Sequence, residues 1–117
     1  MKKKIAISIL SLALLVIPVK ATDYSLQQTR NVSTSAGTAT AYCTGTYHSS
    51  GNTRWNTSWS AYGANLKQAV VSSTMQIPSD SYMTTTGKIT MTNYSYVVAS
   101  TSTTFAFRYS GDRVVAA

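Results

Sequence analysis

The 117-residue chain has a formal net charge of +7, only 11% charged residues, one Cys and one His. The single cysteine excludes an intramolecular disulfide, and one His, one Cys and three separated Asp residues are too few for a zinc site. Because the sequence has no Glu and no nucleophile-elbow pattern, it favours neither glycosidase nor serine-hydrolase chemistry, and we expect no enzyme, cofactor or metal.

Residues 1–21 have the pattern of a cleavable secretory signal peptide. Three lysines at positions 2–4 precede an apolar run over residues 5–19, and the run ends in Val19-Lys20-Ala21, which predicts cleavage after Ala21. The alternative is a membrane anchor, but a span requires roughly 20 apolar residues and this run is shorter. We therefore expect a secreted, extracellular bacterial protein whose mature part has no membrane span.

Removal of this segment also removes much of the positive charge. Residues 22–117 retain six Lys or Arg and three Asp, a net charge of +3, and the cations stand singly along the chain. Nucleic-acid binding requires clustered basic residues that replace phosphate counterions. The mature part therefore has no expected nucleic-acid partner.

The composition of the mature part is typical of β-structure. Ser and Thr make up about a third of residues 22–117, and Tyr and Val are frequent among the rest. Apolar residues alternate in short runs separated by turn-forming residues, and no stretch has a sustained helical period. This pattern predicts a small all-β domain over residues 37–117, with an antiparallel β-sandwich as the favoured fold and a small barrel as the alternative. Residues 22–36 are either an N-terminal arm or an edge strand.

The clearest element is a hairpin formed by residues 38–47 and 53–62. A short loop centred on Gly51 would pair Tyr47 with Trp55 and Cys43 with Trp59. In this register the apolar faces of both strands coincide, and a shift by one residue would separate them. The two tryptophans are therefore expected on the core side of the sheet.

The remaining elements follow in chain order as further strands, giving about seven short strands in total. A turn or bulge is expected near Asn93, where the apolar phase changes. The predicted segments are a strand at 66–77, a strand at 82–92, a polar link or strand edge at 100–104, a strand at 105–109, a turn at 110–112 and a last strand at 113–116.

Cys43 has three interpretations from the sequence: a buried inert thiol, an intermolecular disulfide, or a catalytic thiolate. The thiolate would need a base, and His48 is the only candidate. Because these residues are five apart on one strand, they point to opposite faces of the sheet, which disfavours catalysis. A buried thiol on the apolar face is the favoured interpretation.

Binding residues are more plausible than catalytic ones. Aromatic rings on an exposed β face can stack on sugar rings, while amides and hydroxyls bond to the sugar hydroxyls. Tyr42, Arg54, Asn56 and Tyr62 share the face opposite the tryptophans and are the candidate binding residues. The expected partner is a cell-wall or surface glycan, or a protein target.

Ala41-Tyr42, followed by Tyr47-His48, a glycine-containing turn and Arg54, resembles the lactococcin-972-like bacteriocins. The likeness extends to the secretory signal, the near absence of cysteine and the Tyr- and Thr-rich strands. It implies a bacteriocin-like β-sandwich that acts on the cell envelope of related bacteria. An immunoglobulin-like sandwich is the other arrangement that we consider.

Overall fold

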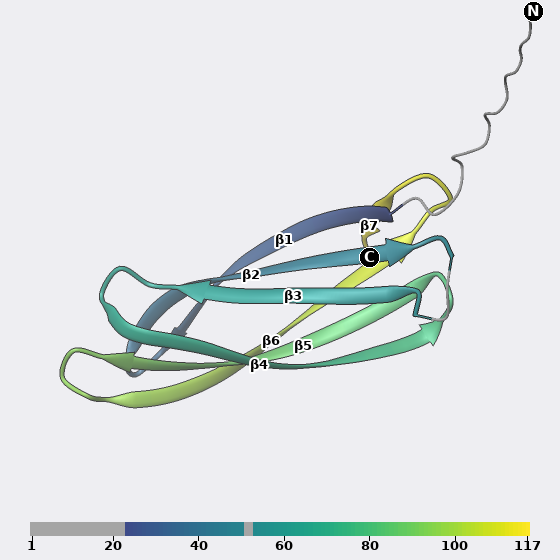
Figure 1. Ribbon diagram of the computed structural model, residues 1–117. Helices are drawn as coiled ribbons and strands as arrows, with labels where there is room; N and C mark the ends of the chain where they lie inside the picture. The colour runs from purple at the N-terminus through teal and green to yellow at the C-terminus, as the bar shows by residue number, and fades with distance from the viewer. Residues whose placement is uncertain (1–22, 51–52) are drawn as a thin grey trace, which may run out of the picture.

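The computed structural model describes residues 23–50 and 53–117 (Figure 1). The predicted signal peptide, its cleavage after Ala21 and the residues at 51–52 lie outside the described residues. Every regular element in the described part is a strand, which confirms the all-β prediction. The seven strands are β1 (Asp23–Thr34), β2 (Gly37–His48), β3 (Trp55–Tyr62), β4 (Leu66–Ser79), β5 (Tyr82–Asn93), β6 (Val98–Tyr109) and β7 (Val114–Ala116).

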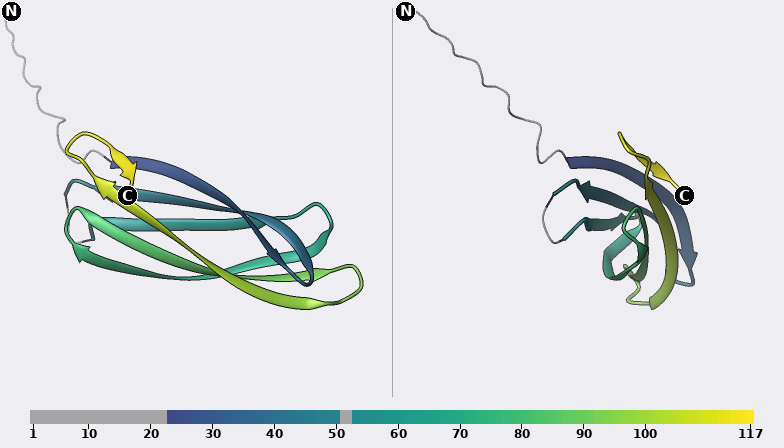
Figure 2. Two further views of the ribbon diagram at one scale, coloured as in Figure 1. Left: turned by 180° about the vertical axis from the view of Figure 1, so that it is seen from behind. Right: turned by 90° about the vertical axis from the view of Figure 1, so that its right-hand side faces the viewer.

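The strands form two antiparallel sheets that make up a small sandwich. One sheet has the order β1-β2-β3 and the other the order β4-β5-β6-β7, so each sheet is a simple meander. Figure 2 shows the twisted strands of both sheets around a common interior. An immunoglobulin domain distributes its strands between its sheets in Greek-key order. The immunoglobulin-like alternative is therefore wrong, because here sequence neighbours remain in the same sheet until the chain crosses over between β3 and β4.

The predicted register of the β2–β3 hairpin is confirmed. Tyr47 lies opposite Trp55, Cys43 opposite Trp59, and Ala41 opposite Ala61. The apolar residues of both strands therefore face the second sheet, and their Ser- and Thr-rich faces point away from it. The alternation of apolar and polar residues in these two segments was enough to determine how β2 pairs with β3.

Several strands are longer than the sequence suggested. Residues 23–34 form β1 at a sheet edge, and residues 100–104 belong to the interior of β6. Strand β4 continues through Pro78, where a register shift between Gln76 and Ser79 interrupts its pairing with β5. Proline lacks a backbone donor and is tolerated at such a bulge on an edge strand.

The interior divides into an aromatic half and an aliphatic half. The aromatic half surrounds Trp55 and Phe107, both fully buried, and the aliphatic half surrounds Leu66, Ile89 and Met91. Trp59 is only partly buried and packs against both halves. Its indole Nε1 donates to Thr85 Oγ1 at 3.0 Å, so the polar atom of the ring has a partner inside the sandwich.

Two glycines provide the space that these rings occupy. A Cβ at Gly45 would lie 2.8 Å from the Phe107 ring, and a Cβ at Gly87 would lie 2.6 Å from the Trp59 ring. Each ring therefore rests directly on the backbone of the opposite sheet. The predicted hairpin register gives Trp59 only its neighbour Cys43 on the same sheet, whereas Gly87 approaches its ring from the other sheet.

Side chains close one side of the sandwich where backbone pairing is absent. Gln28 Nε2 donates to Ala106 O at 2.9 Å, and Arg30 Nη1 donates to Thr104 O at 2.9 Å. The Arg30 guanidinium also lies 4.6 Å from the centroid of the Phe105 ring. Ala106 O also accepts from Ala117 N at 3.0 Å, so side chains of β1 and the residue after β7 together cover this edge of β6. The covered edge is protected from pairing with another chain.

Candidate functional site

Side chains with hydroxyl and amide groups cover the outer face of the sheet β1-β2-β3. It presents the odd-numbered residues of β1 and the even-numbered residues of β2 and β3. Several of these groups bond across strands: Ser25 to Thr46 at 2.8 Å, and Thr40 to Asn31 at 2.8 Å. Charged groups on this face are confined to the end where β1 begins and β2 ends.

Tyr42 and Tyr62 lie on this outer face, on the adjacent strands β2 and β3. Tyr42 lies opposite Ser60 and Tyr62 opposite Thr40, so the two tyrosines occupy a diagonal position across β2 and β3. Diagonal positions are about 7–8 Å apart between α-carbons, within reach of aromatic side chains. Tyr62 is 67% exposed and Tyr42 is half-buried among its strand neighbours. The sequence prediction that these tyrosines share an outer face agrees with the structure.

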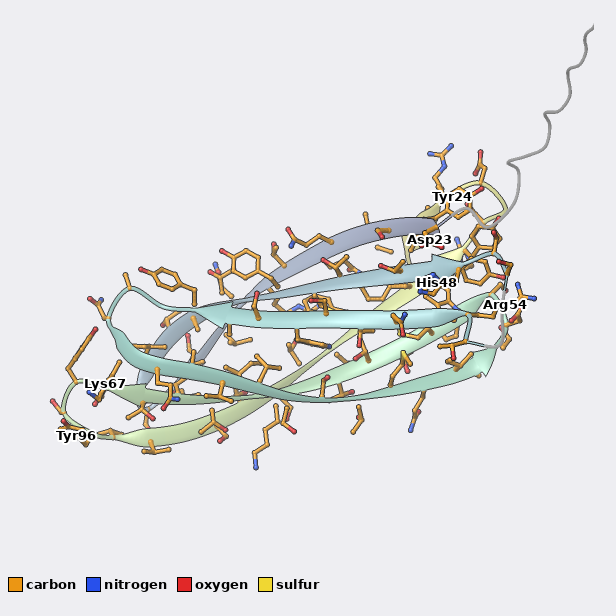
Figure 3. The ribbon with its side chains drawn as sticks, in the orientation of Figure 1. Asp23, Tyr24, His48, Arg54, Lys67 and Tyr96 are labelled. Carbon is orange, nitrogen blue, oxygen red and sulfur yellow. The ribbon has the colours of Figure 1, made fainter. Side chains whose placement is uncertain are left out.

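A chain of three polar side chains lies at the far end of the same face. His48 Nδ1 lies 2.8 Å from Asp23 Oδ1, and His48 Nε2 lies 2.7 Å from Asn56 Nδ2 (Figure 3). Both contacts are satisfied when His48 donates from Nδ1 to the carboxylate and accepts at Nε2 from the amide. Asn56 is therefore oriented by His48, and it lies about 14 Å along the strands from the level of Tyr42.

Arg54 does not join the other three candidates. Its Nη1 donates to Tyr47 Oη and to Ser49 O, each at 3.2 Å, and its Nε lies 3.9 Å from Asp80 Oδ1. The guanidinium thus turns toward the end of the sandwich. Its nearest carboxylate belongs to the β4–β5 turn of the other sheet, 26 positions along the chain. Local alternation could not reveal that partner.

These contacts belong to a network of side chains at one end of the sandwich. The β2–β3, β4–β5 and β6–β7 turns lie at this end, which we call the clasp end. Trp55 Nε1 donates to Asp80 O at 3.0 Å, and Tyr47 Oη donates to Asp80 Oδ2 at 3.3 Å. The ring of Tyr47 stacks on that of Tyr109 with centroids 4.0 Å apart. The clasp end is therefore built to hold the two sheets together, and Arg54 has a structural role in it.

Sequence reasoning missed Asp23 and His48 as surface partners because the pairing of β1 was ambiguous. Asp23 lies opposite His48, and the whole β1–β2 register follows from a tight turn between Thr34 and Gly37. A hairpin centred on that turn pairs the two residues, so the turn is the signal in the sequence that could have found them. The weak alternation of β1, whose inner face includes Gln28 and Arg30, concealed this signal.

Cys43 lies on the inner face, fully buried and free, and His48 lies on the outer face. The two side chains are therefore separated by the sheet, and a Cys–His pair is excluded by geometry. Burial raises the pKa of the Cys43 thiol from its ordinary value of 9.0 to about 12. The thiol is protonated, and therefore unreactive, at neutral pH.

We expect the folded protein to be inert toward a thiol reagent such as DTNB, and to react once it is unfolded in urea. The free energy of unfolding should fall as the pH rises from 9 toward 12, since the unfolded chain loses this proton before the folded chain does. Urea titrations of wild type and Cys43→Ala across this range isolate the thiol contribution from that of the tyrosines. Rapid labelling of the folded protein would contradict the burial.

Within residues 23–50 and 53–117, there is no pocket and no group of three or more side chains suited to a metal ion. The same part of the chain has no helix long and apolar enough to cross a bilayer. Comparison with protein-family models, with curated proteins and with solved structures gives no match for this chain.

Proposed function

We propose that this protein is an exported, non-catalytic module that binds an extended glycan at the bacterial cell surface. The observation that carries the proposal is the diagonal pair Tyr42 and Tyr62, set among the hydroxyl and amide groups of the outer face. The export is inferred from the sequence of residues 1–21.

The chemistry of the face suits a linear polysaccharide. A tyrosine ring offers an apolar surface to the C–H face of a sugar and a polar tip to water, at a small cost in conformational entropy. Thr and Ser hydroxyls donate and accept, which matches the hydroxyls of a sugar. From Tyr62 to Asn56 the face spans seven residues of β3, about 20 Å, which is the length of several sugar rings.

The proposal predicts that Tyr42→Thr/Tyr62→Thr binds an insoluble polysaccharide at least about tenfold more weakly than wild type, a loss of about 1.4 kcal/mol. Threonine is a good strand residue and matches the surrounding hydroxyl groups, so the fold should be retained. Pull-down with peptidoglycan, chitin, cellulose and xylan, quantified over protein concentration, provides the measurement.

The matched control is Tyr82→Thr, the same change on the other sheet, where Tyr82 pairs with Arg108. It should bind as wild type does. A wild-type protein that binds none of the four polysaccharides would refute the proposal, as would a double variant with undiminished binding.

A second candidate is a bacteriocin that acts on the cell envelope. It rests on the local resemblance around Tyr47-His48 and Arg54, and on the contact between Tyr47 and Arg54 at the clasp end. Clearing of lawns of related bacteria by purified protein would favour this candidate. Polysaccharide binding without clearing favours the binding module.

A further inference from the structure

The turn between β5 and β6 exposes a run of large apolar side chains at the end of the sandwich opposite the clasp end. Tyr94 is 69% exposed, Tyr96 71%, Val97 41% and Val98 61%; we call residues 94–98 the tip. Figure 3 shows Tyr96 at one end of the molecule, with Asp23 and His48 at the other. Tyr96, Val97 and Val98 are consecutive, and an exposed apolar run of this kind is uncommon on a protein surface without a binding role.

The backbone of the tip is held in one conformation by Asn93. Its Oδ1 accepts from Ser95 N at 2.9 Å and from Val97 N at 3.0 Å, while its backbone N donates to Val97 O. The tip therefore presents its side chains on a preorganised turn.

Tyr96 has a left-handed backbone with φ of 63°. Glycine or asparagine is the favoured residue in this conformation, and a bulky side chain is unfavourable there. The exposed ring of Tyr96 is not part of either core cluster, and Lys67 Nζ lies 5.5 Å from its centroid. An unfavourable conformation that displays an exposed aromatic ring indicates a role outside the fold.

The distribution of charge separates the two ends. All three Asp residues of the sequence lie at the clasp end: Asp23 contacts His48, Asp80 contacts Arg54, and Asp112 lies in the β6–β7 turn. Lys67 and Lys88 are exposed in the half of the sandwich that ends in the tip, and none of the three Asp lies in that half. Lys67, whose Nζ lies over the Tyr96 ring, therefore places a positive charge beside the tip, and no Asp lies in that half of the sandwich.

From this combination we propose that the tip docks on the surface of an anionic lipid bilayer. Tyr94 and Tyr96 would lie at the level of the headgroups, where tyrosine is enriched, and Val97 and Val98 would contact the upper acyl chains. Lys67 would face a lipid phosphate, because a lysine near an anionic surface adds to binding. A turn that lies at one end of the molecule can reach a fluid surface (Figure 1), and the positive charge of Lys67 beside it complements an anionic one. This docking is independent of the proposed glycan face.

The test uses lipid vesicles of pure phosphatidylcholine and of phosphatidylcholine with one third phosphatidylglycerol. Wild type should sediment with the anionic vesicles, and binding should fall as salt rises. Tyr96→Gly should bind about tenfold more weakly, while its Tm should be no lower than that of wild type, because glycine relieves the left-handed backbone. Lys67→Gln should lose about fivefold, and only on the anionic vesicles.

The Tyr42→Thr/Tyr62→Thr variant should bind vesicles as wild type does, so the tip and the glycan face fail or succeed separately. Absence of wild-type binding to anionic vesicles would overturn the proposal, as would Tyr96→Gly with unchanged binding. Tyr96-dependent capture of a surface protein from cells, without vesicle binding, would overturn it in favour of a protein partner.

Discussion

Replacing Trp55 with alanine is expected to lower the free energy of unfolding by about 4 kcal/mol, a large part of the total stability of a domain of this size. The side chain is fully buried, packs edge-on against Tyr47 with centroids 5.1 Å apart, and donates to Asp80 O at 3.0 Å. Its loss leaves a cavity in the aromatic half and an unpaired carbonyl in the β4–β5 turn. Urea denaturation followed by circular dichroism gives the measurement.

Two variants serve as controls for this prediction. Trp55→Phe retains most of the apolar volume and loses the hydrogen bond, so we expect a smaller loss of about 1–2 kcal/mol. Trp59→Ala should also cost less than Trp55→Ala, because Trp59 is only partly buried. A loss below about 1 kcal/mol for Trp55→Ala would show that the aromatic half is not packed around this ring.

Gly45→Ala is expected to destabilise the fold by about 3 kcal/mol, because the added Cβ overpacks a closed interior. The Cβ would lie 2.8 Å from the Phe107 ring, which is fully buried in the aromatic half of the interior. The sign of the effect is informative. Elsewhere in a strand, alanine in place of glycine stabilises by about 0.4–1 kcal/mol through the unfolded state.

A double-mutant cycle tests the cause. Gly45→Ala combined with Phe107→Leu should lose less than the sum of the two single losses, since leucine frees space above the glycine. Additive losses would mean that the ring and the glycine do not meet. If Gly45→Ala stabilised the protein, the result would mean that β2 has a different register from the one described.

The hairpin of β2 and β3 could be predicted because all of its determinants lie close together in the chain. Tyr47 and Trp55 are eight residues apart, and the alternation of each strand limits the pairing to a single register. The turn after Asn93 was predictable for the same reason, since the shift in apolar phase falls within a few residues. Tyr42 and Tyr62 also follow from this local alternation.

Arg54 shows where such reasoning fails. Alternation places it beside Asn56, yet its guanidinium contacts Tyr47 and Asp80 at the end of the sandwich. The site of Asp23 was missed for a related reason: β1 carries polar residues on both faces, because Gln28 and Arg30 point inward to reach carbonyls of β6. Asp80 is far from Arg54 in the sequence, and β6 is far from β1.

The sequence by itself determined the fold class, the β2–β3 register and the face that carries Tyr42, Asn56 and Tyr62, because a period of two and the chemistry of turns act over a few residues. Only the tertiary structure decided that the sheets are two meanders, that Gly45 and Gly87 lie beneath aromatic rings, and that the three Asp residues gather opposite the tip. These features depend on how one sheet packs on the other. Such packing joins residues that are tens of positions apart in the chain.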